Sequence, residues 1–89
     1  MLKISVNPES AEMVRLRAEG RLVGPWVDEL QKSCEPLLQG HARVSLDADG
    51  ITFTSLTGLL LLKELMKRGV EVRRCPLFLA AQLKESSHE

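Results

Sequence analysis

Few residues of this 89-residue chain have side chains suited to covalent or acid–base chemistry. Cys34 lies within a helical apolar pattern, where cysteine behaves as a small hydrophobic residue. Cys75 has no base next to it in sequence, and Arg73 and Arg74 would lower its pKa only modestly. His41 could activate a serine only beside a G-x-S-x-G turn, which the sequence lacks. We predict that the protein is not an enzyme; an enzyme based on Cys75 is the alternative.

Ligand sets for metals, nucleotides and nucleic acids are also sparse. Asp47 and Asp49 lack the further oxygen ligands of a calcium loop, so Asp47-Ala48-Asp49-Gly50 is interpreted as a turn. The six glycines form no phosphate-binding motif. Twelve basic residues balance twelve acidic ones, and aromatic residues make up 3% of the chain. We therefore expect no metal, no cofactor and no nucleic-acid partner.

Length and composition indicate one small domain. The chain is 44% hydrophobic and 27% charged, as in ordinary globular proteins. We assign residues 1–84 to this domain and 85–89 to a frayed tail. The sequence shows no apolar stretch near the roughly 20 residues of a membrane span and no signal-peptide pattern. Two cysteines do not suggest a disulfide framework, so we expect a cytoplasmic protein.

The elements that position these residues follow from the hydrophobic pattern. Alternation of apolar and polar residues predicts strands at 2–6, 14–18, 42–46 and 70–72. The first two form an antiparallel hairpin around residues 7–10. Helices are predicted from Pro25 to Gly40, with a kink or a frayed last turn caused by Pro36, from about Ser55 to Arg68, and from Pro76 to about Lys84.

Period-two alternation in every strand places the helices on one face of the sheet. The predicted fold class is α/β. It is a single small domain with a four-to-five-stranded, mostly parallel sheet, an N-terminal antiparallel hairpin and about three helices on one face.

The second predicted helix is unusual. Its apolar arc contains Leu59, Leu61, Leu62, Leu65 and Met66. Its charged side contains Lys63, Glu64, Lys67 and Arg68, and Glu64 could pair with Arg68. Leu56 and Leu60 project from the charged side, so about 150 Å² of apolar surface stays exposed unless loop 21–24 or 47–50 covers it. An exposed pair of this kind is a candidate docking surface.

The segment Ile51-Thr52-Phe53-Thr54-Ser55-Leu56-Thr57-Gly58-Leu59 resembles the signature region of STAS domains, which include anti-sigma-factor antagonists and relatives in transporters. The order of predicted elements is similar too, so the resemblance covers almost the whole chain. It implies a STAS-like βαβ superhelix. It also implies a bacterial protein–protein interaction module that takes part in the regulation of transcription.

Members of that family have Asp-Ser-Ser-Gly or a near variant, and a partner kinase phosphorylates the first serine. With Gly58 as the fixed point, Ser55 stands at the acidic position, Leu56 at the phosphoacceptor and Thr57 after it. Leucine has no hydroxyl, so the resemblance implies a degenerate phosphorylation site at Leu56. Thr54, Ser55 and Thr57 remain open as substitute acceptors, although Ser55 is better explained as the helix N-cap.

We expect the partner-binding surface to comprise Ser55, Leu56, Thr57, Leu60, Lys63 and Lys67. The resemblance implies a protein partner, either an anti-sigma factor of kinase-like type or the ATPase of an ABC-type lipid transporter with this chain as auxiliary subunit. A nucleotide-sensing STAS domain is a further alternative. Leu77 and Phe78 cannot both face inward with Leu79 and Leu83, so a homodimer contact also remains open.

Overall fold

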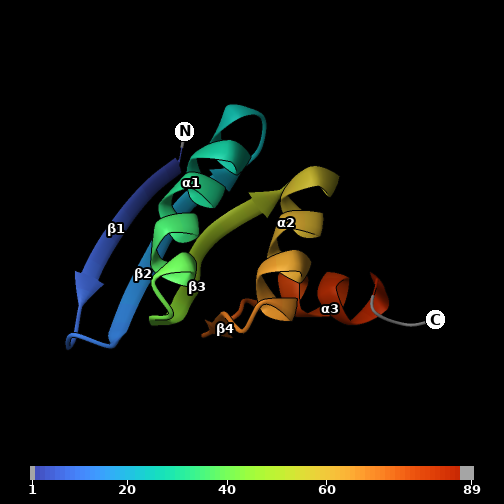
Figure 1. Ribbon diagram of the computed structural model, residues 1–89. Helices are drawn as coiled ribbons and strands as arrows, with labels where there is room; N and C mark the ends of the chain where they lie inside the picture. The colour runs from blue at the N-terminus through green and yellow to red at the C-terminus, as the bar shows by residue number, and fades with distance from the viewer. Residues whose placement is uncertain (1, 87–89) are drawn as a thin grey trace.

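The computed structural model describes residues 2–86 and shows a four-stranded sheet with three helices (Figure 1). The strands lie in the order β1 (Leu2–Pro8), β2 (Met13–Leu22), β3 (Arg43–Thr54) and β4 (Glu71–Arg73). The helices are α1 (Pro25–Gln39), α2 (Leu56–Lys67) and α3 (Leu77–Ser86). β1 pairs antiparallel with β2, whereas β3 runs parallel to β2 and β4. The predicted fold class is confirmed.

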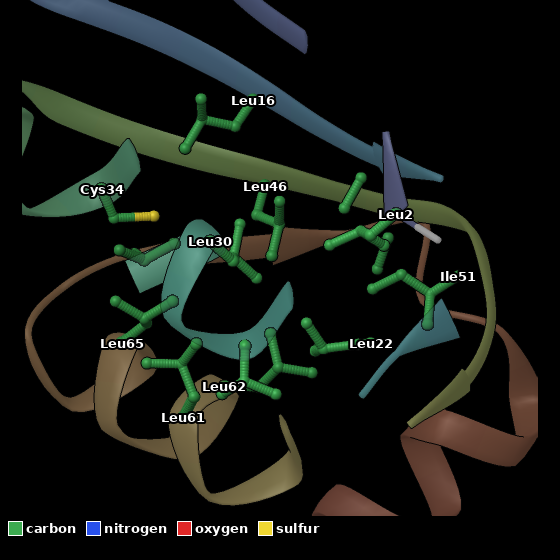
Figure 2. Packing of buried hydrophobic residues seen from close by; sticks show 14 of the residues in the cluster. Leu2, Leu16, Leu22, Leu30, Cys34, Leu46, Ile51, Leu61, Leu62 and Leu65 are labelled. Atoms are coloured by element: carbon green, nitrogen blue, oxygen red, sulfur yellow. The ribbon is translucent and has the colours of Figure 1, made fainter. Parts of the chain in front are cut away.

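The core lies between the sheet and the helices. Figure 2 shows Leu46 of β3, Leu30 of α1 and Leu62 of α2 gathered there, and all three are fully buried. α3 packs against α2 and buries Leu79. The core is aliphatic apart from Cys34, as expected from a chain with so few aromatic residues.

Helix boundaries follow local capping chemistry. Gly24 adopts a φ of 55°, and Pro25 supplies the preset φ of a first helical residue. Pro36 lies inside α1, yet the helix continues to Gln39, and the N–H of Gly40 donates to the Pro36 carbonyl at 3.0 Å. The predicted end at Gly40 is confirmed. α3 continues to Ser86, beyond the predicted end at Lys84, and residues 87–89 of the predicted tail lie outside the described residues.

The predicted turn at residues 47–50 is wrong, because β3 runs through it without interruption. The pairing with β2 shifts register twice. Arg17 lies opposite Asp47 but Glu19 lies opposite Gly50, so β3 has one extra residue between these pairs. A second extra residue of β3 lies between Ile51 and Phe53. Such bulges let a strand accommodate extra residues while it stays paired. Gly50 fits because a Cβ there would come within 3.1 Å of the Ala18 carbonyl oxygen. Tertiary pairing therefore overrides turn-forming composition.

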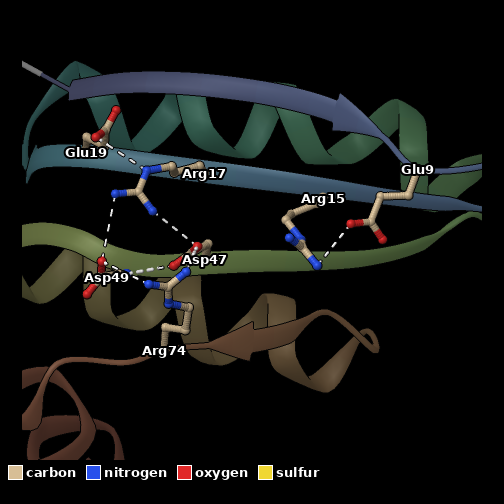
Figure 3. A network of polar contacts seen from close by, with 7 residues as sticks. All are labelled: Glu9, Arg15, Arg17, Glu19, Asp47, Asp49 and Arg74. Atoms are coloured by element: carbon tan, nitrogen blue, oxygen red, sulfur yellow. Dashed lines mark hydrogen bonds and ion pairs between the residues drawn. The ribbon is translucent and has the colours of Figure 1, made fainter.

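The face of the sheet opposite α1 and α2 is polar (Figure 3). At its centre Asp47, only 7% exposed, accepts a hydrogen bond from Nη1 of Arg17 at 3.1 Å and pairs with Nη1 of Arg74 at 3.5 Å. Arg74 follows β4 and has a φ of 54°, an uncommon conformation for a residue with a side chain. Asp47 thus connects β2, β3 and the segment after β4.

No helix within residues 2–86 is both long enough and apolar enough to cross a membrane.

Candidate partner-binding surface on helix α2

Hydroxyl groups fix the turn between β3 and α2. Ser55 Oγ accepts a hydrogen bond from the N–H of Gly58 at 3.2 Å, which confirms the predicted N-cap. Ser55 Oγ also lies 3.0 Å from Thr57 Oγ1. The buried Thr54 donates from Oγ1 to the Ser55 carbonyl at 3.1 Å. These bonds hold the residue that follows, Leu56, in a defined position.

The same turn is pinned to the end of β2 through the backbone of Leu22. The N–H of Ser55 donates to the Leu22 carbonyl at 3.1 Å. Gly58 lies so close to this site that a Cβ would meet the Thr54 hydroxyl and come within 2.8 Å of the Leu22 carbonyl oxygen. The predicted role of Gly58, close approach of the helix to the sheet, is confirmed.

Leu56 and Leu60 are exposed, as the sequence pattern predicts. Leu56 is 71% exposed and Leu60 is 54% exposed, so neither predicted covering loop buries them. The opposite side of α2 is anchored in the core by buried Leu59, Leu62 and Leu65. The apolar pair is therefore a fixed surface feature on a rigid helix.

Phe53, at the end of β3 just before this turn, adds further apolar surface. Its ring is 47% exposed, and the Arg21 guanidinium lies 5.1 Å from the ring centroid. This distance is typical of a cation–π contact, which keeps the ring in place without covering it.

The predicted partner-binding residues share one side of α2 and its cap. Leu56, Leu60, Lys63 and Lys67 follow one another at intervals of four, three and four residues, which places them along a single stripe. We call these four residues the α2 stripe. Ser55 and Thr57 flank its N-terminal end, and Thr57 is exposed. That this surface binds a partner stays a prediction.

Met66 was predicted to lie in the core and is instead 45% exposed. It lies at the border of the apolar arc in the last turn of α2, where burial depends on how α3 packs. There it lines a groove of about 430 Å³ together with Lys63, Lys67, Leu83 and Lys84. Sequence reasoning missed Met66, Leu83 and Lys84 as surface residues of interest, because their proximity depends on the placement of α3.

The start of α3 is also apolar at the surface. Leu77 is 90% exposed and Phe78 is 40% exposed, whereas Leu79 is fully buried, so the prediction that these residues cannot all face inward is confirmed. A homodimer contact at this position stays a prediction.

Arg68 forms its ion pair across helices, and Glu64, the predicted partner along α2, adds a smaller electrostatic contribution that also raises the pKa of Arg68. Its Nη1 and Nη2 donate to the two carboxylate oxygens of Glu35 on α1, at 2.6 and 3.0 Å. Two parallel bonds of this kind match the planar, forked geometry of the guanidinium group. The hydrogen bonds from Arg68 lower the pKa of Glu35.

Burial disfavours the thiolate form of both cysteines. Burial raises the pKa of Cys34 to about 11, in keeping with its predicted core position. Burial also raises the pKa of Cys75, so the predicted lowering by Arg73 and Arg74 is wrong. Desolvation outweighs the neighbouring charges, because both arginine side chains are exposed to water. Among residues 2–86, no three His, Cys, Asp or Glu side chains gather in a way that could bind a metal ion.

No protein-family model matches the sequence, and no curated protein matches it significantly. The fold, in contrast, has close counterparts among solved structures. The anti-sigma factor antagonist SpoIIAA in its unphosphorylated form superimposes with a TM-score of 0.70 at 15% identity, over 89% of this chain and 80% of that one. The phosphorylated form of SpoIIAA, described as a Bacillus cell fate determinant, gives a TM-score of 0.77 at 15% identity, over 94% and 83%.

A third counterpart is an uncharacterised protein from Shewanella loihica PV-4 that is described as having a SpoIIAA-like fold. It gives a TM-score of 0.59 at 16% identity, over 97% of this chain and 76% of that one. These identities establish a shared architecture. The chain therefore has a SpoIIAA-like fold, which confirms the STAS-like fold that the resemblance of residues 51–59 implied.

Proposed function

We propose that this protein is a non-enzymatic protein–protein interaction module of the anti-sigma-factor-antagonist type, which docks through the N-terminal half of α2. The observation behind the proposal is the exposed pair Leu56 and Leu60 on a helix whose first turn is fixed by the Ser55 cap. Covering a leucine side chain contributes about 1.5–3 kcal/mol when it is fully buried. Two leucines held rigidly at the surface therefore favour a binding role.

The structural likeness to SpoIIAA supports the proposed type of regulatory role. SpoIIAA is described as an anti-sigma factor antagonist and has been solved in phosphorylated and unphosphorylated forms. By analogy we place this protein among bacterial, cytoplasmic regulators of transcription. The raised pKa values of Cys34 and Cys75 support a role without nucleophilic catalysis.

Control by phosphate at the usual position is not part of this proposal, because Leu56 has no hydroxyl to accept it. Of the nearby hydroxyls, that of Thr54 is buried and that of Ser55 accepts the capping bond from Gly58. Thr57 is the exposed one. We therefore propose that the partner is bound constitutively or is controlled elsewhere. A stoichiometric adduct of about 80 Da in the intact mass of protein from its native host would show that phosphate regulation persists through another residue, and would rule out constitutive binding.

Exchange of Leu56→Asp together with Leu60→Lys tests the docking surface. Because both side chains are exposed, we expect the fold to survive, with circular dichroism unchanged and a melting temperature within a few degrees of wild type. Recovery of the native partner on the tagged protein, quantified by mass spectrometry, should fall at least about tenfold.

Leu77→Asp is the matched control, since Leu77 is an exposed leucine that belongs to α3 and not to the α2 stripe. It should leave partner recovery unchanged. Undiminished recovery on the folded double variant would overturn the proposal. The identity of the recovered protein separates an anti-sigma factor from a transporter ATPase.

A further inference from the structure

β1 forms one border of the sheet, and within residues 2–86 no strand lies on its outer side (Figure 1). Border strands commonly avoid further pairing by being very short, by a bulge or by several charges. β1 has none of these devices: it is seven residues long, it pairs with β2 in one unbroken register, and Lys3 is its only charged residue. Its proline, Pro8, stands at the last position. This border is therefore open to the addition of a strand.

Two backbone hydrogen bonds show which residues of β1 present their N–H and C=O groups to the open border. The Met13 carbonyl of β2 accepts from the N–H of Glu9, directly after β1, at 2.9 Å. The preceding Glu12 carbonyl accepts instead from the N–H of Arg43 of β3, at 2.7 Å. Backbone groups alternate between the two sides along a strand, so odd-numbered residues of β2 bond to β1 and even-numbered ones to β3.

The same alternation applies to β1. The β1 residues that lie opposite the odd-numbered residues of β2, and so use their backbone groups within the chain, are Lys3, Ser5 and Asn7. The groups that point outward are the N–H and C=O of Leu2, Ile4 and Val6 and the C=O of Pro8. An added strand would find a regular ladder of donors and acceptors.

The side chains on the helix side of this border are aliphatic and incompletely covered. Leu2 is buried, Ile4 is half-buried and Val6 is 54% exposed. They line a groove of about 260 Å³ together with residues of α1, namely Trp26, Glu29 and Ser33. An aliphatic side chain of an added strand would cover this apolar surface and gain from its own burial.

From these observations we infer that β1 pairs antiparallel with β1 of a second copy of this protein, across a two-fold axis at Ser5. The two sheets then join into one continuous sheet. Each Ile4 lies opposite Val6 of the other copy, and each Lys3 lies opposite Asn7 of the other copy.

Length and charge select this register. Because outward-pointing residues must face one another, the axis lies at Ser5 or at a neighbouring position. An axis at Ile4 or Val6 aligns fewer residues, and the axis at Ile4 also brings the two Lys3 side chains into diagonal positions about 7–8 Å apart. An axis at Ser5 aligns all seven residues, forms about six hydrogen bonds and separates the two ammonium groups by about 14 Å.

The strand complements itself, which favours a second copy over a foreign strand. Two-fold symmetry repeats every favourable contact, so Ile4 meets Val6 twice, and the two Ser5 side chains meet on the polar face. The contact is about 23 Å long and therefore smaller than the roughly 800 Å² per partner of a standard interface. We expect a weak dimer, with a dissociation constant of about 10–300 µM.

The dimer is independent of the proposed function. β1 and α2 lie on opposite sides of the molecule in Figure 1, so pairing through β1 leaves the α2 stripe of both copies accessible. A dimer would then present two docking surfaces, and its presence or absence does not decide whether a partner binds to α2.

Sedimentation analysis between about 10 µM and about 1 mM tests the dimer. Val6→Pro removes one outward N–H and none of the bonds to β2, so the fold should persist while association weakens at least about tenfold. Val6→Lys, which places a charge on the border, should have the same effect. Val6→Thr is the matched control, because it keeps the N–H and the branched shape, and it should change association less than about threefold.

Hydrogen exchange tests the alternation of the backbone groups. Between about 20 µM and about 1 mM protein, exchange of the Ile4 and Val6 amides should slow at least about twofold, because pairing protects them only in the dimer. The Ser5 and Asn7 amides, which bond within the chain, should exchange at a constant rate.

Disulfide cross-linking tests the register. With Cys75→Ser to remove the more accessible native thiol, Ser5→Cys should form linked dimers on mild oxidation, because residues at the axis have Cβ atoms about 4.5–5.5 Å apart. Asn7→Cys is the matched control on the same strand, and it should cross-link at least about fivefold less, because its two copies lie about 14 Å apart.

A protein that stays monomeric at about 1 mM, or a dimer that survives both Val6→Pro and Val6→Lys, would overturn the inference. So would equal cross-linking at the two introduced cysteines. A dimer lost in Leu77→Asp would place the contact on α3, and protection of the Ile4 and Val6 amides only by an added foreign strand would make β1 a site for another protein; either result would overturn it too.

Discussion

Cys34 illustrates how burial sets the chemistry of a single residue in this protein. The thiol is fully buried among the side chains of the core, and burial raises its pKa from 9.0 to about 11. Nearby Glu35 acts in the same direction, whereas Arg68 opposes it. At neutral pH the group is therefore a protonated, apolar part of the core.

This shift predicts a loss of stability in alkali. The folded protein keeps a proton on Cys34 that the unfolded chain releases, so the stability gained is present below pH 9.0 and is lost as pH rises to about 11. Urea denaturation across this window should show the free energy of unfolding falling with pH. Cys34→Ala, although less stable throughout because of its cavity, should show a shallower slope. Parallel slopes for the two proteins would contradict the assignment.

Residues whose environment is local were predictable from sequence. Ser55 was identified as a cap because its bond goes to Gly58, three residues away. The partner of Arg68 was not predictable, because Glu35 lies on another helix. The pKa of Cys75 was not predictable either, because its desolvation depends on packing. The exposure of Leu56 and Leu60 was predictable, since it follows from their angular position on one helix.

At the scale of elements, the position of α2 depends on the absence of a side chain at Gly58. We predict that Gly58→Ala lowers the free energy of unfolding by about 1–3 kcal/mol, because the new Cβ would press on the Thr54 hydroxyl and the Leu22 carbonyl. Gly40→Ala is the matched control, with its nearest atom at 3.4 Å and a φ of −81°. It should change stability by less than about 0.5 kcal/mol in urea denaturation. A Gly58→Ala protein as stable as wild type would show that the helix can shift freely.

The order of the strands and helices followed from the sequence, whereas the length of β3 did not. Its residues Asp47 to Gly50 have the composition of a turn, yet β2 lies alongside and pairs with Asp47 and Gly50 across one register shift, and a second shift follows before Phe53. A bulge depends on the partner strand, so periodicity within one segment does not reveal it. The groove between α2 and α3 escaped prediction for the same reason, because two separate elements form it.

For the molecule as a whole, Asp47 connects three parts of the open face of the sheet. Its carboxylate accepts from Arg17 of β2, pairs with Arg74 after β4 and accepts from the Asp49 N–H at 3.1 Å (Figure 3). Asp47→Asn keeps an oxygen acceptor but removes the charge, so we predict a loss of about 1–2 kcal/mol in the free energy of unfolding.

The neighbouring Asp49 provides the control for this prediction. Its side chain is half exposed and lies 3.8 Å from both Arg17 and Arg74, so Asp49→Asn should cost less than about 0.5 kcal/mol. Thermal and urea denaturation of both variants would measure the two losses in the free energy of unfolding. Equal losses would mean that the ion pairs of Asp47 contribute no more than those of a solvated carboxylate.

The shortness of β4 bears on how copies of this protein meet in a crowded solution. An unpaired border strand invites a foreign strand to extend the sheet, the first step of many aggregates. Here that border is three residues long, includes the exposed Arg73 and is followed at once by Arg74 in its left-handed backbone conformation. Such a short edge offers an incoming strand few backbone groups for hydrogen bonding, and the two arginines place positive charge beside it. The β4 border of the sheet is therefore protected against strand addition, whereas the opposite border, β1, is seven residues long.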